Sequence, residues 1–303
     1  MGVPRNRPAT RTPRNRLALA LQTALVAVAV ALIAAVAAFA QDEPFNASRP
    51  RLSEPAGSKF PQKAYLLTQP STTPLNAQNV RVLENGQPVN DLAVELSTDS
   101  RKARLGTVLL IDASESMTGE PIEQAMIAAR TFVEQRGPRE RIAVMTFNSE
   151  TTLLTDFTQD IGTLETALAG VPDLAFGTHI YDAVGVATEL LETGKITVGS
   201  IVLLSDGADV GSVADPAVAT KEAAATKARV FSVGLQGPQF EAGTLEELAK
   251  ATGGAYALAQ NASDLEGVYE ALSASLRNEY LVTYESFAAP GIPVSVNVSS
   301  GAF

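Results

Sequence analysis

Short apolar runs alternate with helical segments across residues 105–277, and this alternation constrains the fold more than any other feature of the chain. Residues 107–112 (TVLLID) and 199–205 (GSIVLLS) are nearly continuous apolar runs, as strands buried on both faces of a sheet should be. Strands that alternate with helices form right-handed crossovers and a mainly parallel sheet with helices on both faces. We therefore predict a doubly wound, Rossmann-like α/β domain at residues 105–277.

The other elements of this domain follow from the same patterns. After Pro121, which suits the first turn of a helix, apolar residues recur at helical spacing. Further strands are expected at residues 141–147, 151–154, 229–235 and 255–258. Further helices are expected at residues 161–168, 181–191, 214–227, 244–251 and 264–276.

The segments on either side of this domain, residues 59–104 and 278–303, have strand patterns instead. Asn85-Gly86, the strongest short signal for a hairpin, lies between two alternating stretches of the first segment. Because each segment holds too few strands to be stable alone, we infer that the two pair into a small β-sandwich. The α/β domain is then inserted between the two halves of the sandwich.

The N-terminal 40 residues indicate export. Five arginines precede an apolar run at residues 17–40, which ends in Ala38-Phe39-Ala40. A basic start and a small-x-small exit are typical of a signal peptide, but a run of 24 residues is also long enough for a membrane helix. A cleaved signal peptide and an uncleaved membrane anchor both remain open. Either one places residues 41–303 outside the cytoplasmic membrane, with residues 41–58 as a linker.

The remainder of the chain is strongly acidic. Residues 1–40 hold five of the 23 basic residues and none of the 33 acidic ones, so residues 41–303 carry a formal charge of −15. Such a surface repels phosphate backbones, which excludes nucleic acid as the expected partner, whereas it is compatible with divalent cations. The absence of cysteine excludes disulfides, thiolate metal sites and cysteine nucleophiles.

Two of the predicted strands end in aspartate, Asp112 and Asp206. Ligands of open α/β sheets bind at the carboxyl ends of strands where the strand order reverses, so these two carboxylates are expected to converge. In an extended turn, Ser114 and Ser116 would point the same way as Asp112, and Thr178 precedes a predicted helix. Ligation by oxygen alone suits Mg²⁺, Mn²⁺ or Ca²⁺.

Three motifs follow in order along the chain: Asp112-x-Ser114-x-Ser116, then Gly177-Thr178, then Ser205-Asp206-Gly207. Together they resemble the metal-ion-dependent adhesion site of the von Willebrand factor type A (VWA) family, over about residues 105–277. Thr252-Gly253-Gly254 before the last predicted strand is similar as well.

The resemblance implies a role for each matching residue. Ser114, Ser116 and Thr178 would contact the metal, and Asp112 and Asp206 would act mainly through bound waters. A carboxylate of a protein partner would complete the coordination, so the resemblance implies an exported adhesion or assembly module. The family often has glycine where this chain has Glu115. As an alternative, extracytoplasmic modules of this type resemble the N-terminal part of F-type secretion or pilus-assembly proteins, in which case the chain would be a fragment that stops at residue 303.

An enzyme is not expected. The single histidine, His179, invites a Ser-His-Asp interpretation with Ser114 or Ser205, but no G-x-S-x-G elbow is present. The chain also lacks a GxxxxGK[ST] phosphate-binding loop, and Gly253-Gly254 is better explained as a helix cap. Single aspartates often cap helices, yet several convergent oxygens favour a hard cation over that role.

Overall fold

The computed structural model describes residues 45, 50–69, 73–238 and 240–301. The chain divides into residues 1–42 and residues 43–303, and the described residues all belong to the second part. No helix among them is long and apolar enough to cross a membrane. The expected signal peptide or anchor, residues 1–40, lies outside the described residues.

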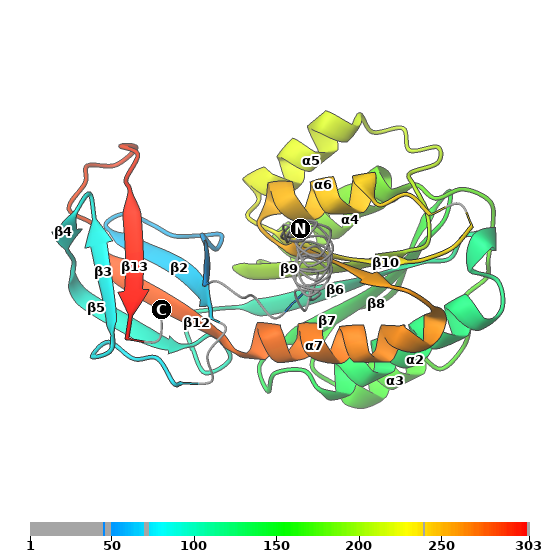
Figure 1. The fold of residues 1–303 in the computed structure, drawn as a ribbon, viewed down its shortest axis with the longest axis horizontal. Helices are drawn as coiled ribbons and strands as arrows, with labels where there is room; N and C mark the ends of the chain where they lie inside the picture. The colour runs from blue at the N-terminus through cyan, green and yellow to red at the C-terminus, as the bar shows by residue number, and fades with distance from the viewer. Residues whose placement is uncertain (1–44, 46–49, 70–72, 239, 302–303) are drawn as a thin grey trace, which may run out of the picture. The chain divides into compact units, whose positions relative to one another are not determined.

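The centre of the fold is a six-stranded sheet with the strand order β11-β10-β9-β6-β7-β8 (Figure 1). Its strands are β6 (Leu105–Asp112), β7 (Arg141–Phe147), β8 (Thr151–Thr158), β9 (Val198–Ser205), β10 (Arg229–Leu235) and β11 (Ala255–Ala259). All neighbouring strands run parallel except β7 and β8, which are antiparallel. The predicted α/β fold with a mainly parallel sheet is confirmed.

Helices cover both faces of this sheet (Figure 1). One face carries α2 (Glu120–Glu134), α3 (Ile161–Ala167) and α7 (Leu265–Arg277), and the other carries α4 (Ile180–Thr193), α5 (Pro216–Ala225) and α6 (Gly243–Thr252). Successive strand residues point to opposite faces, so Leu109 of β6 packs in the first core and Val108 in the second. Both faces therefore need apolar residues, which explains the continuous apolar runs.

The ends of the helices follow local signals in the sequence. Asp215 accepts hydrogen bonds from the backbone N–H groups of Ala217 and Val218 at the start of α5. Gly253, with φ +75°, ends α6 in the left-handed conformation, so the prediction of a helix cap there is correct. Two short 3₁₀ helices, η1 (Glu115–Met117) and η2 (Ala262–Asp264), complete the helical elements of the described residues.

The segments that flank the α/β domain form two further sheets. One has the strand order β1-β2-β12-β5 and the other β13-β3-β4. Their strands are β1 (Arg51–Ser53), β2 (Gln62–Thr68), β3 (Val80–Glu84), β4 (Gln87–Pro88), β5 (Asn90–Leu96), β12 (Glu279–Glu285) and β13 (Val296–Ser300). Val82 and Val282, one from each sheet, are buried in a shared apolar core. Each of the two sheets combines strands from before the α/β domain with one strand from after it, β12 or β13.

Three details differ from the sequence-based expectations. β8 continues to Thr158 instead of ending at residue 154, because it pairs with β7 along that length. Arg51–Ser53 forms β1 and Phe45 is buried against Phe231, although both lie in the stretch 41–58 that is expected to be a linker. The three residues of β1 show no strand pattern in the sequence. They form a strand because they pair antiparallel with β2. Within the strand-like segment 278–303, the last strand begins only at Val296, and the preceding Ser295 exchanges hydrogen bonds with Asn85 of the hairpin turn.

Candidate functional site

The candidate site lies where the strand order of the central sheet reverses. From β6 the chain continues to β7 on one side, whereas from β9 it continues to β10 on the other side. Ile111 of β6 is paired with Leu204 of β9, so the residues that follow, Asp112 and Ser205, end their strands side by side, with Asp206 directly after. The crevice outside such a switch point is the usual ligand site of open α/β sheets.

Asp112 is a fully buried carboxylate in this crevice. One of its oxygens accepts a hydrogen bond from the backbone N–H of Ser114 (2.8 Å), and the other accepts one from the hydroxyl of Ser205 (2.5 Å). Burial raises the pKa of Asp112 to about 6, and the neighbouring charge of Asp206 adds to this increase while the hydrogen bonds oppose it. No ion pair among the described residues involves Asp112 or Asp206.

A chain of hydrogen bonds connects the remaining side chains of the first and third motifs. The hydroxyls of Ser114 and Ser116 lie 2.9 Å apart, and the Ser116 hydroxyl donates to a carboxylate oxygen of Asp206 at 2.8 Å. The loop is not the simple extended turn that the alternating pattern suggested, because Ser116 lies within η1. Burial also raises the pKa of Asp206. Glu115 is exposed to solvent.

Thr178 of the second motif is buried, and backbone hydrogen bonds hold it against the third loop. Its N–H donates to the carbonyl of Val210 (3.1 Å) and the N–H of Val210 donates back (2.9 Å). Gly177 before it has φ +98°, and a Cβ there would lie 3.1 Å from Ser149, so this bend requires glycine. Within the described residues, no hydrogen bond joins the Thr178 hydroxyl to Asp112, Ser114, Ser116 or Asp206.

Several supporting residues escape the sequence analysis. Asp182 accepts hydrogen bonds from the backbone N–H groups of Val213 and Ala214, so it holds the third loop to the start of α4. Asp209 accepts a hydrogen bond from the Ser212 hydroxyl at 2.5 Å and is half-buried. An aspartate in the first turn of a helix carries the same sequence signal as any helix-stabilising acid, so only the fold reveals the contacts of Asp182.

The oxygen atoms that could ligate a metal in this crevice suit a hard cation and no other common metal. No group of three or more histidine, aspartate or glutamate side chains that could hold a metal occurs in the described part of the chain. The site instead offers two carboxylates and the hydroxyls of serine and threonine. Oxygen-only ligands suit Mg²⁺, Mn²⁺ and Ca²⁺, and a cation would compensate the carboxylates that no basic side chain neutralises.

Comparisons with known proteins agree with this architecture. Residues 107–208 match the family model described as von Willebrand factor type A domain. Inter-alpha-trypsin inhibitor heavy chain H4 of Homo sapiens is 29% identical over 187 residues, which cover 57% of this chain and 20% of that protein. The Bos taurus protein of the same name is 28% identical over 181 residues, which cover 52% and 19%. The match thus spans about a fifth of the length of these relatives.

Solved structures support the same fold. A protein described as von Willebrand factor type A from Catenulispora acidiphila superposes with a TM-score of 0.55 at 13% identity and covers 83% of this chain and 68% of its own. Proximal thread matrix protein 1 from the mussel byssus gives a TM-score of 0.50 at 13% identity, with coverage of 69% and 51%. At such low identity these likenesses show the fold alone.

Proposed function

We propose that this chain, which contains a von Willebrand factor type A domain, uses that domain to bind a divalent cation and, through the cation, a carboxylate of a partner protein. The observation that carries the proposal is the chain of hydrogen bonds from Asp112 through Ser114 and Ser116 to Asp206, in a crevice without a compensating basic group. Two carboxylates in such surroundings repel each other unless a cation lies between them.

Five side chains would hold the ion: Asp112, Ser114, Ser116, Thr178 and Asp206. The bound Mg²⁺ or Mn²⁺ supplies a positive centre on an otherwise acidic protein, and that centre attracts an acidic side chain of the partner. Ser205 supports these residues without contacting the ion, because its hydroxyl donates a hydrogen bond to Asp112 and fixes the orientation of that carboxylate.

The rim of the crevice supports a protein as the partner. Phe176, Val210 and Val213 belong to the second and third loops, and they are 75%, 50% and 92% exposed. Exposed apolar side chains beside a polar centre are typical of protein interaction sites. We infer that the partner presents its carboxylate next to an apolar side chain, which packs on this rim.

The surroundings of His179 favour a binding role over catalysis. Its Nδ1 lies 3.4 Å from Asp182, and its ring packs against Gly211, where a Cβ would come within 2.5 Å of Nε2. No serine or threonine hydroxyl donates a hydrogen bond to this ring within the described residues, so a nucleophile activated by histidine has no support. The apolar run at residues 17–40 favours a location outside the cytoplasmic membrane.

Metal-dependent capture of the partner tests this function. The full chain is immobilised and exposed to a cell-surface extract in Mg²⁺ and in EDTA, with Asp206→Asn and Glu115→Gln compared in parallel. Both substitutions remove one negative charge at the same crevice, but only Asp206 belongs to the candidate ligand set. We expect Asp206→Asn and EDTA to abolish capture of the same partner, whereas Glu115→Gln retains it. Equal capture by both variants, or capture that survives EDTA, would contradict the proposal.

The apolar rim provides a separate test of the partner chemistry. Val213→Ser removes an exposed apolar side chain that forms no part of the ligand set, so metal affinity should stay unchanged while partner affinity falls. Loss of one exposed apolar contact at an interface typically costs about 1 kcal/mol, or roughly fivefold in affinity. Val218→Ser, on the exposed surface of α5, is the control. Equal partner affinity for Val213→Ser and the control would exclude the rim from the interface.

A further inference from the structure

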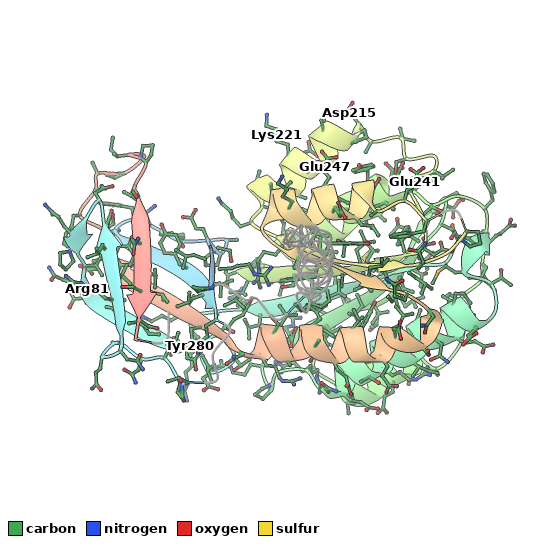
Figure 2. The ribbon with its side chains drawn as sticks, in the orientation of Figure 1. Arg81, Asp215, Lys221, Glu241, Glu247 and Tyr280 are labelled. Carbon is green, nitrogen blue, oxygen red and sulfur yellow. The ribbon has the colours of Figure 1, made fainter. Side chains whose placement is uncertain are left out.

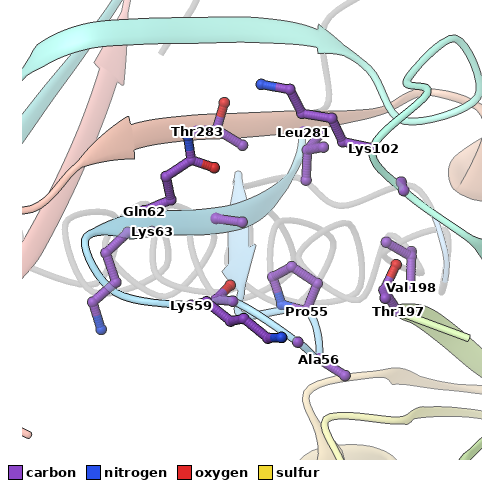
Figure 3. Close-up of a pocket in the computed structure, with 14 residues that line it drawn as sticks. Pro55, Ala56, Lys59, Gln62, Lys63, Lys102, Thr197, Val198, Leu281 and Thr283 are labelled. Carbon is purple, nitrogen blue, oxygen red and sulfur yellow. The ribbon is translucent and has the colours of Figure 1, made fainter. Parts of the chain in front are cut away.

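A pocket of about 280 Å³ opens at the opposite end of the central sheet from the candidate metal site. It lies between the loop at residues 55–59, the strands β2 and β12, the residues just before β6 and the start of β9 (Figure 3). The candidate metal site lies at the other end of β9, where Ser205 is seven positions after Val198, which corresponds to roughly 23 Å at about 3.3 Å per residue. The two sites are therefore independent of each other.

The charge of this pocket contrasts with the rest of the protein. Lys59, Lys63 and Lys102 line it, and none of its lining residues is acidic, although acidic residues outnumber basic ones by 33 to 23 in the chain. Lys63 has a partner in Glu54 at 4.0 Å. Lys59 and Lys102 form no ion pair with any described residue, and their ammonium groups lie at opposite ends of the lining (Figure 3).

The floor of the pocket is apolar. Leu281 and Val198 are almost fully buried there, and they pack with Ala64 and Ala103 in a small apolar cluster. A pocket with an apolar floor and a few polar groups at its mouth is the usual form of a small-molecule site, although its volume is near the lower end of the typical range of roughly 300–1,000 Å³. Gln62 and Thr283 add neutral hydrogen-bonding groups to the wall (Figure 3).

We propose that this pocket binds a small organic anion with a carboxylate head and a short apolar body. The ammonium groups of Lys59 and Lys102 attract the head to the pocket, and the body covers Leu281 and Val198. Because the two ammonium groups lack acidic partners in the described structure, an anion gains their attraction without having to break an existing ion pair. The apolar floor adds affinity in proportion to the carbon surface that it covers.

Protein-observed NMR of the full chain tests this site directly, with the methyl groups of Leu281, Val198, Ala64 and Ala103 as reporters. Three probes are titrated: hexanoate, acetate and hexanol, which carry head and body, head alone, and body alone. We expect hexanoate to shift these methyl signals with at least about fivefold higher affinity than either of the other two probes. The measured affinity should fall with added salt, since exposed charges are screened.

Two charge-reversed variants complete the test. Lys59→Glu/Lys102→Glu should weaken hexanoate binding at least about fivefold. The control Lys221→Glu/Lys250→Glu changes the net charge by the same amount on the exposed surfaces of α5 and α6, away from the pocket (Lys221 in Figure 2). This control should leave the affinity for hexanoate unchanged. If the charge reversal impairs folding, the neutral pair Lys59→Gln/Lys102→Gln takes its place. Equal affinity in both variants, no shift of the floor methyls, or equal binding of the three probes would overturn the proposal.

Discussion

Asp112 is a carboxylate placed where water does not reach it, and the groups around it determine what it can do. Two hydrogen bonds stabilise its charged form, but burial and Asp206 oppose that charge, and the balance raises its pKa to about 6. A cation bound nearby would stabilise the charged form of this buried carboxylate, because it would compensate the unpaired negative charge. This is the physical reason why the crevice should bind a metal ion.

Ser205 gives the sharpest prediction at the residue scale. Ser205→Ala removes the hydroxyl that orients Asp112 but removes none of the five candidate ligands. Groups that orient metal ligands typically contribute 10- to 100-fold to affinity, so we expect Mg²⁺ affinity to fall by about that factor in calorimetric titrations.

The control for this variant is Ser232→Ala. Ser232 is also a fully buried serine, on β10 next to β9, and its hydroxyl donates to the carbonyl of Leu245 (2.7 Å). Both substitutions should destabilise the fold, Ser232→Ala by about 1 kcal/mol and Ser205→Ala by about 1.5–3 kcal/mol, because the Ser205 hydroxyl bonds to a carboxylate. Equal losses of metal affinity in the two variants would show that Ser205 has no particular role.

The sequence predicts the candidate ligands better than the residues that support them. Asp112, Ser114, Ser116 and Asp206 are predictable because they follow apolar strands in a recognisable spacing. The support from Ser205 is not predictable, since a serine at a strand end carries no signal for the direction of its side chain.

At the scale of elements, the main strands and helices of the α/β domain are predictable to within a few residues. β7 and β10 begin and end where the apolar patterns at residues 141–147 and 229–235 do. β1 and η1 are not predictable, because a three-residue edge strand depends on its partner strand and a 3₁₀ turn lacks its own apolar period.

Glu140 connects two of these elements and should make stability depend on pH. It is buried just before β7, and its carboxylate accepts hydrogen bonds from the Thr107 hydroxyl of β6 (2.5 Å) and the N–H of Gly137 (3.1 Å). Burial raises its pKa above the ordinary value of 4.5 in spite of these bonds. The folded state therefore retains this proton to higher pH than the unfolded state does.

Linkage fixes the sign of the effect. Where the folded state binds more protons than the unfolded state, the free energy of unfolding decreases as pH rises. From pH 4.5 upwards the native protein should lose stability on account of Glu140, and Glu140→Gln should lose less over the same range. Urea unfolding between pH 4.5 and 8 measures this difference, with exposed Glu123→Gln as the control. Parallel pH profiles for the native protein and Glu140→Gln would contradict the assignment.

At the scale of the whole described fold, one buried ion pair joins the α/β domain to a flanking sheet. Arg229 of β10 donates to both carboxylate oxygens of Glu279, and one of these contacts measures 3.0 Å. Thr68 of β2 and Ser200 of β9 complete the network at 3.1 Å each. Glu279 also begins β12, two residues after α7 ends. The pairing joins residues 50 positions apart, so no local pattern in the sequence reveals it.

Removing one partner of this ion pair should destabilise the protein more than replacing both partners with apolar residues. Arg229→Leu or Glu279→Leu alone leaves one buried charge without a partner, which typically destabilises a protein by about 3–5 kcal/mol. The double variant should cost much less than the sum of the two, as a double-mutant cycle in urea measures. Lys227→Ala, which breaks a surface pair with Glu54 (3.3 Å), should cost at most about 1 kcal/mol. Additive effects at Arg229 and Glu279 would contradict the coupling.

The most direct measurement of the central claim is a calorimetric Mn²⁺ titration of the full chain with Asp112→Ala and Glu115→Gln in parallel. We expect one site per chain in the native protein and in Glu115→Gln, with similar affinities, and loss of that site in Asp112→Ala. Substituting an exposed glutamate in the loop changes only the long-range charge, whereas Asp112 is part of the site. Equal Mn²⁺ binding by the native protein and Asp112→Ala, or no binding by the native protein, would contradict the account.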